Sequence, residues 1–257
     1  MSVTENSWSR LRAFTDARIG LGRAGISLPT AEMLAFQMAH AQARDAVHLP
    51  LDVDRLLAGL GRVAGLAAPV VVTSQAEDRD DYLRHPDRGR RLATDAILAD
   101  EAPDLALVIA DGLSARAVQD HAAPMAAALI AALPGVRLSA PVIVRQGRVA
   151  VGDAVGAALG ARAVVVLIGE RPGLSSPDSL GLYYTFAPQV GLTDARRNCI
   201  SNVRPAGLDF PAAAARLAWL HDQACRMATS GVAIKDRTTT AAIDGAGRSF
   251  LSPPKRD

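Results

Sequence analysis

Two apolar runs that end in turn-forming residues constrain the fold of this chain most. The first covers residues 105–110 and breaks into a turn that begins at Asp111, and the second covers residues 163–168 and breaks into a turn that contains Glu170. Short apolar runs bounded by turns are typical of strands that are buried on both faces of a parallel sheet. Open α/β sheets bind ligands at the carboxyl ends of such strands. The two turns therefore predict a small-ligand site in the second half of the chain.

Length and charge narrow the class of protein. The chain has 257 residues, which is enough for one large or two modest domains. Its 28 basic and 26 acidic residues leave a formal charge of only +2, without the clustering on one face that nucleic-acid binding requires. The longest apolar run is shorter than the roughly 20 residues that span a bilayer. We expect a soluble protein that binds neither nucleic acid nor membrane.

Cysteine and histidine usage indicates the compartment. The chain has two cysteines, Cys199 and Cys225, and no signal peptide precedes them, which indicates a reducing cytoplasm rather than a disulfide framework. Its five histidines are scattered, and none has a cysteine or carboxylate partner at a zinc-binding spacing. No metal site is expected.

Periodicity predicts a helical beginning followed by strands and helices in alternation. Helices are expected over 7–19, 31–48 with Thr30 as N-cap, 53–64, 114–133, 153–160 and 211–227, and strands over 68–74, 105–110, 141–151, 163–169 and 183–186. This order predicts the α/β class. A mainly helical N-terminal region, residues 1–95, would contact a partner and precede a Rossmann-like, mostly parallel α/β domain, residues 96–257.

A glycine motif near the start imitates a nucleotide-binding fingerprint. Residues 20–25 satisfy G-x-G-x-x-G, and Asp45 follows at about the expected spacing of 20 residues. That motif binds a dinucleotide only between a strand and a helix, because the turn must direct the helix N-terminus at the pyrophosphate. Since a helical pattern precedes it here, we interpret these glycines as a helix-terminating turn.

Ser114 imitates a catalytic nucleophile. It follows a strand and precedes a helix, but Arg116 occupies the position where a nucleophile elbow requires a small residue. The candidate base, His121, falls on the same helix. Ser114 is therefore expected to cap the helix that follows it.

Two polar segments leave alternatives open. Residues 78–91 carry five arginines that would line a phosphate site or partner surface, although the interleaved aspartates favour an exposed, salt-bridged face. Residues 170–181 combine a strand-end charge with glycines, serines and prolines, which indicates either the polar rim of a ligand site or a helix cap after a connecting loop. Within the polar segment 196–202, Cys199 by itself indicates a buried filler more than a reactive thiol.

Several long segments resemble one family. They are Val144–Asp153, Ile168–Gly181 and Arg197–Asn202, supported by Ala17–Gly25, Ala39–His48, Tyr82–Leu92, Ile109–Ser114 and Ser230–Asp236. Together they resemble the small (light) subunit of ethanolamine ammonia-lyase over nearly the whole chain. The resemblance implies an adenosylcobalamin-dependent lyase that converts ethanolamine to acetaldehyde and ammonia by a radical mechanism, in which the cofactor performs the difficult chemistry.

The resemblance also implies how the work is divided between subunits. The large subunit would bind ethanolamine and supply catalysis, so this chain is expected to carry no catalytic residues and to hold the cobalamin from the other side, in a hetero-oligomer. The implied cobalamin contacts are Val149, Glu170 and Cys199: an apolar surface for the corrin rim, a carboxylate for corrin amides and a weak donor at close approach.

Coordination and location follow from the same resemblance. No histidine has an aspartate two positions before it, so the Asp-x-His-x-x-Gly motif that replaces the benzimidazole is missing and base-on cobalamin is expected. The expected location is cytoplasmic. Few residues precede Trp8, so any leading segment for entry into a bacterial microcompartment is short or missing, and encapsulation is left open. Two other classes stay open: a Rossmann-like hydrolase or oxidoreductase acting alone, and a purely structural partner subunit.

Overall fold

A mixed six-stranded sheet forms the centre of the protein, in the order β1-β3-β2-β4-β5-β6. The computed structural model describes residues 3–94, 96, 98 and 102–235; the predicted boundary at residue 95 and the family-segment residue Asp236 lie outside this part. The strands are β1 (Val70–Thr73), β2 (Ala106–Ala110), β3 (Val142–Arg145), β4 (Ala163–Gly169), β5 (Leu180–Phe186) and β6 (Arg197–Val203). Strands β1, β3, β2 and β4 are parallel to one another, and β5 is antiparallel to both β4 and β6. The predicted α/β class with a mostly parallel sheet is confirmed.

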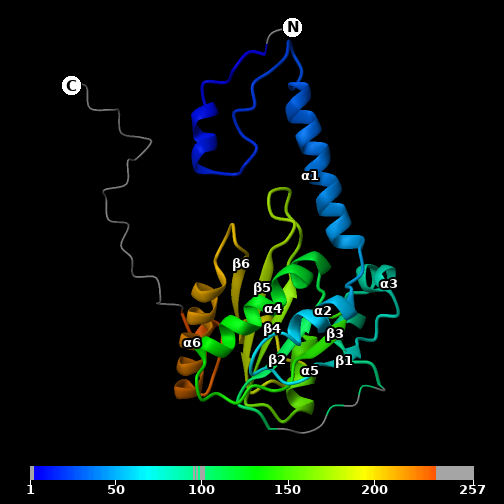
Figure 1. The fold of residues 1–257 in the computed structure, drawn as a ribbon, viewed down its shortest axis with the longest axis vertical. Coiled ribbons are helices and arrows are strands. Elements are labelled where there is room, and N and C mark those ends of the chain that lie inside the picture. Colours follow the sequence, from blue (N-terminus) through cyan, green and yellow to red (C-terminus); the bar gives the residue numbers. More distant parts are fainter. Residues whose placement is uncertain (1–2, 95, 97, 99–101, 236–257) are drawn as a thin grey trace, which may run out of the picture.

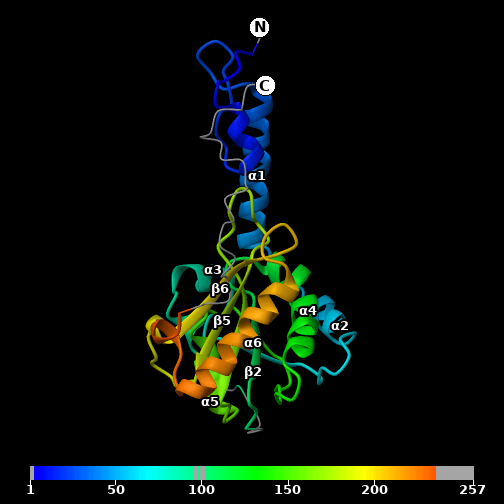
Figure 2. The same cartoon turned by 90° about the vertical axis from the view of Figure 1, so that its left-hand side faces the viewer.

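Helices cover both faces of this sheet (Figures 1 and 2). The α-helices are α1 (Thr30–His48), α2 (Val53–Leu60), α3 (Arg79–Arg84), α4 (Ala115–Ala132), α5 (Val151–Ala158) and α6 (Phe210–Met227), and the short 3-10 helices are η1 (Ser9–Phe14), η2 (Arg88–Arg90), η3 (Asp194–Arg196) and η4 (Gly231–Ala233). Helices α2, α4 and α6 pack on one face, and α5 packs on the other. None of the described helices is both long and apolar enough to cross a membrane.

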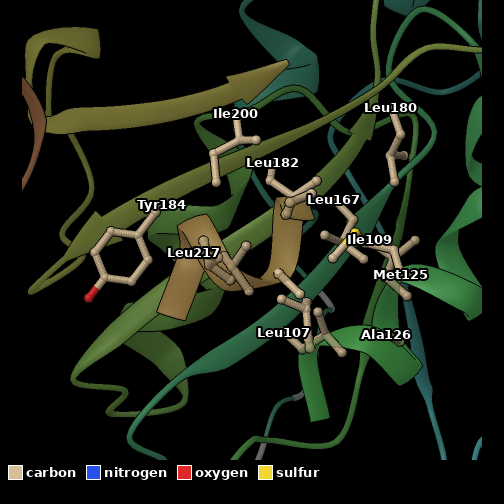
Figure 3. Packing of buried hydrophobic residues seen from close by; sticks show 14 of the residues in the cluster. Leu107, Ile109, Met125, Ala126, Leu167, Leu180, Leu182, Tyr184, Ile200 and Leu217 are labelled. Atoms are coloured by element: carbon tan, nitrogen blue, oxygen red, sulfur yellow. The ribbon is translucent and has the colours of Figure 1, made fainter. Parts of the chain in front are cut away.

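Alternation along β2 explains why its run is apolar throughout. Leu107 and Ile109 join the cluster that contains Met125 of α4 and Leu217 of α6, as Figure 3 shows. The intervening residues of β2, such as Val108, join the cluster on the α5 face. Because successive side chains of a strand point to opposite faces, a strand covered on both sides has no polar position. The sheet thereby acquires two core layers.

The strand predicted over 141–151 is too long. Strand β3 ends at Arg145, and the chain then turns into α5. Gln146 has a left-handed φ of 55°, and the backbone N–H groups of Gln146 and Gly147 donate to the Asp111 carboxylate, each at 2.9 Å. These side-chain contacts replace the ladder bonds of a longer strand, and the periodicity of the sequence carries no sign of them.

The N-terminal helix predicted over 7–19 is also wrong. Only Ser9–Phe14 is helical, as the 3-10 helix η1, and none of its residues is buried. A short helix is marginal in water unless an apolar face packs on something. The second helix starts where expected, but Pro29 is its N-cap and Thr30 is its first residue, without a side-chain cap. The third ends at Leu60 rather than 64.

Strand β6 was not foreseen, because its sequence is polar. Only Arg197, Ile200 and Val203 are buried, while the residues between them face solvent or lie half-buried. As the last strand in the sheet order, β6 keeps polar side chains on its outer side. The loop before β5 contains no helix, so the helix-cap interpretation of 170–181 is wrong; the chain enters β5 at Leu180.

Ser114 caps a helix as predicted, but the glycines at 20–25 do not form the predicted helix-terminating turn, because the helix expected before them ends at Phe14. The Ser114 hydroxyl accepts from the Ala117 N–H at 3.2 Å as the N-cap of α4, and it donates to the Pro177 carbonyl at 2.8 Å. Gly20, Gly22 and Gly25 have left-handed φ values between 59° and 74° in an irregular segment between η1 and α1. Among the described residues before them, no strand leads into these glycines, so the strand–turn–helix geometry of a dinucleotide site is missing there.

An N-terminal arm, residues 3–48, extends away from the sheet (Figures 1 and 2). Of the 19 residues of α1, only Ala46 is buried. Residues 3–28 fold back onto this helix: Arg12 pairs with Glu32 at 3.2 Å, and the Arg18 guanidinium lies 5.0 Å from the centre of the Phe36 ring. The arm leaves large apolar side chains exposed, namely Trp8, Phe14, Ile26, Leu28, Met33, Leu34, Phe36 and Met38.

Candidate functional site

A cleft of about 760 Å³ opens at one edge of the sheet. It lies where β2, β3, β4 and β6 end and where β5 begins, because β5 is antiparallel to its neighbours. The lining residues are Tyr82, Gly112, Leu113, Arg148, Val149, Ile168, Gly169, Glu170, Arg171, Gly173, Ser175, Ser176, Ser179, Tyr183, Ser201, Asn202 and Arg204. The two turns that the apolar runs predicted therefore meet in one cleft.

The turns after β2 and β4 are in direct contact. The Leu113 N–H donates to the Gly169 carbonyl at 2.9 Å. Gly112 has a φ of +60°, and a Cβ at this position would collide with the Gly169 carbonyl oxygen and the Ile168 side chain. Glycine is required at 112 both by its backbone conformation and by this close approach. The contact sets the floor of the cleft.

Asp111 organises the turn that carries Val149. Its carboxylate accepts N–H groups from Gln146, Gly147 and its own neighbour Gly112, at 2.9, 2.9 and 3.1 Å. Burial raises the pKa of Asp111, and the Arg79 guanidinium, 3.8 Å away, together with these donors opposes that shift. A carboxylate that accepts several backbone N–H groups fixes the local path of the chain. Val149 follows this turn and is held half-buried at the cleft wall.

Glu170 stands at the carboxyl end of β4 and connects two loops. Its Oε2 accepts the Asn202 N–H at 3.1 Å and the Ser179 hydroxyl, so it joins loop 170–179 to the end of β6. Oε1 accepts no hydrogen bond from the described residues and lies next to the Gly181 position. One carboxylate oxygen is therefore structural, and the other is free to accept from a ligand.

Cys199 lies beside the cleft rather than in its lining. It is exposed on β6 and pairs with Tyr183 of β5, which does line the cleft. Desolvation raises the pKa of the Cys199 thiol, while a hydrogen bond with Tyr183 opposes the shift. A raised pKa keeps the group protonated at neutral pH, as a weak donor instead of a nucleophile. Val149 and Glu170 both line the cleft, and Cys199 does not.

Tyr82 and Arg148 were not anticipated as cleft residues. Tyr82 is buried, and its ring lies between two guanidinium groups, with Arg79 at 4.7 Å and Arg148 at 4.3 Å from the ring centre. Burial raises the pKa of Tyr82 to about 12. The available sequence signal was Tyr82 itself, the one Phe, Trp or Tyr in the charged segment 78–91. Large aromatic side chains are seldom left on a fully exposed charged face, so its presence indicates that part of this segment is buried.

The rest of the charged segment bears out the salt-bridge interpretation in part. Two arginine–aspartate pairs form within it, Arg84–Asp80 at 3.5 Å and Arg88–Asp81 at 2.7 Å. Desolvation alone would raise the pKa of Asp81, but hydrogen bonds from the Glu77 N–H, Arg88 and His85 outweigh it and lower the pKa to about 2. Arg79 is different: it points inward and donates to the Gly112 carbonyl at 2.8 Å.

A buried ion pair connects the helix below the cleft to the edge strand. Arg197, at the start of β6, bonds to Asp153 of α5, and both side chains are 3% exposed. Arg197 also pairs with the exposed Asp194 at 2.8 Å. Burial raises the pKa of Asp153, and the Arg197 charge opposes that shift. The pair fixes α5, which begins two residues after Val149, against the strand that carries Cys199.

These features define an α/β protein with a candidate ligand cleft at the carboxyl edge of its sheet and an unpacked N-terminal arm. The family model described as ethanolamine ammonia-lyase light chain matches residues 5–235. A small subunit of ethanolamine ammonia-lyase from Azotobacter vinelandii is 58% identical over 255 residues, covering 95% of this chain and 94% of the relative. One from Ralstonia nicotianae is 55% identical over 263 residues, covering 97% and 96%. The chain belongs to the ethanolamine ammonia-lyase light chain family.

Proposed function

We propose that this chain is the small subunit of an adenosylcobalamin-dependent ethanolamine ammonia-lyase and holds the cobalamin at the interface with the large subunit. The observation that carries the proposal is the cleft itself, which Val149 and Glu170 both line where the parallel strands of the α/β sheet end. The bound cofactor would supply the radical chemistry that converts ethanolamine to acetaldehyde and ammonia, and the protein would supply binding and orientation.

The chemistry of the cleft fits one side of a corrinoid. The corrin ring has an apolar rim that carries neutral amide side chains. Val149 offers an apolar surface, and Oε1 of Glu170 is an acceptor without a partner among the described residues. Cobalamin is larger than a cleft of about 760 Å³, so this chain would cover only part of it. The large subunit would cover the remainder, and it would contribute the ethanolamine site.

The N-terminal arm supports the proposed partner. Its exposed apolar side chains form a surface of the kind that single-chain proteins rarely leave open to solvent. Met33, Leu34, Phe36 and Met38 are each at least 45% exposed on a helix that extends from the domain. We propose that the large subunit covers this arm, and that residues 1–95 act as the partner-contacting region beside a cofactor-binding region, residues 96–257.

The coordination mode and location are part of the same proposal. Among the described residues, no histidine lines the cleft, so none is placed to replace the benzimidazole base at cobalt. We therefore propose base-on cobalamin. We also propose that the protein acts in the cytoplasm.

Acetaldehyde release tests the proposal directly. Ethanolamine and adenosylcobalamin are incubated with this chain, with its large-subunit partner, and with both, after each is verified as folded. We expect turnover only when both are present. A large subunit that is equally active alone would reject the cofactor-holding role and favour a structural subunit. Activity or nucleotide affinity of this chain alone would favour an independent enzyme.

Glu170→Gln is expected to weaken cobalamin binding by the assembled complex about tenfold, because a hydrogen bond to a charged acceptor is stronger than one to a neutral amide. Visible-absorbance titration with cyanocobalamin measures the affinity. Glu77→Gln is the matched control, since Glu77 is exposed and outside the cleft lining. Equal affinities for both variants would remove Glu170 from the proposed site.

A further inference from the structure

The cleft has an excess of positive charge that neutral corrin amides do not explain. Three arginines line it, Arg148, Arg171 and Arg204, against a single carboxylate, Glu170. Amide groups carry no net charge, so they gain little from several guanidinium groups. Guanidinium groups gathered in a partly enclosed site favour an anion, and their planar fork matches phosphate oxygens.

Two of the three arginines lack a carboxylate partner. Arg204 lies 3.8 Å from Asp178 and donates to Asn202 at 3.0 Å, so its charge is partly offset. Within the part of the chain that the structure describes, neither Arg148 nor Arg171 forms an ion pair. Arg171 is exposed at the rim, whereas Arg148 is half-buried in the wall. Their charges are available to a bound anion.

Arg148 is held in place before any ligand arrives. The backbone N–H of Arg148 donates to the Gly89 carbonyl at 2.7 Å. Its side-chain Nη2 donates to the Tyr82 carbonyl at 2.9 Å, and its guanidinium stacks on the Tyr82 ring. Its Nε is buried and has no hydrogen-bond partner among the described residues. A buried N–H without an acceptor is costly, and a guanidinium held by stacking loses little further freedom on binding.

We propose that Arg148, assisted by Arg171, binds the phosphate diester of the cobalamin nucleotide loop. This inference rests on the proposed cobalamin site and adds to it the recognition of the cofactor's anionic part. The phosphate diester is the group of cobalamin that matches an excess of positive charge in the cleft. Cobinamide, which lacks the nucleotide loop, offers no such group, so the site discriminates between the two corrinoids.

Comparison of these two corrinoids tests the inference. The complex of this chain with its large subunit is titrated with cyanocobalamin and with dicyanocobinamide, and the visible absorbance of the corrin reports binding. Arg148→Gln keeps a donor for the Tyr82 carbonyl but removes the charge. We expect it to weaken cyanocobalamin about tenfold and to leave dicyanocobinamide unchanged, since only the charged hydrogen bonds to phosphate are lost. Arg148→Lys should restore part of the affinity.

Matched measurements separate the possible failures. Arg84→Gln is the control, because Arg84 is exposed on α3 and outside the cleft lining; it should change neither affinity. Equal weakening of both corrinoids by Arg148→Gln would overturn the phosphate inference and leave the cobalamin site standing. Inorganic phosphate is titrated against the same variants. If Arg148→Gln abolishes phosphate binding while both corrinoid affinities stay intact, the arginines bind free phosphate and the inference is overturned. A wild-type complex that binds neither corrinoid would overturn the proposed function together with the inference.

Discussion

Gly112→Ala is expected to destabilise the chain by about 4 kcal/mol, combining the cost of a left-handed residue with that of overpacking. The added Cβ would meet the Gly169 carbonyl oxygen and the Ile168 side chain, both on or directly beside the backbone of β4. Neither neighbour is the end of a flexible side chain that can turn away. The ends of β2 and β4 would have to separate, which would also open the floor of the cleft.

Thermal unfolding of the purified chain, followed by far-ultraviolet circular dichroism, measures this cost as a fall in Tm of about 10 °C. Gly135→Ala is the matched control, because Gly135 also has a left-handed φ, +82°, but a Cβ there would meet nothing within 4 Å. The control should cost only about 1 kcal/mol, from the backbone conformation alone. Equal losses for the two variants would mean that the contact between the two turns is not tight.

Asp153→Ala is expected to cost about 3 kcal/mol, because it leaves a buried guanidinium without its main partner. Arg197 and Asp153 are each 3% exposed, so solvent compensates poorly for the lost carboxylate. Asp194 still contacts Arg197 at 2.8 Å, but it is 83% exposed and compensates only in part. We expect α5 and β6 to loosen relative to each other, and with them the wall of the cleft that carries Val149.

Urea unfolding of the chain measures the change in the free energy of unfolding. The matched control is Asp222→Ala, which breaks the exposed pair with Arg226, whose side chains are 49% and 70% exposed, and should cost well under 1 kcal/mol. The double variant Asp153→Leu with Arg197→Met should recover much of the loss, since an apolar pair leaves no unpaired charge. A double variant less stable than Asp153→Ala would contradict this account.

The sequence predicted those elements whose signal lies within a few consecutive residues. The apolar runs of β2 and β4 are buried on both faces, so no polar residue was tolerated and the pattern was plain. Ser114 caps α4 because its hydroxyl bonds to a backbone group three residues on. The edge strand β6 was not predicted, because several of its side chains are exposed to solvent. A segment of seven residues that is half polar has the sequence pattern of a loop.

The sequence alone determined the α/β class, the alternation of buried strands with helices, the turns after β2 and β4 and, through its long family segments, the light-chain resemblance. Only the tertiary structure decided the sheet order with its antiparallel edge, the joining of Asp111 to the turn before Val149, and the placing of Tyr82 and Arg148 in the same cleft as Glu170. The reason is physical: periodicity and caps act over a few residues, whereas these contacts join residues tens of positions apart and exist only once the chain has packed.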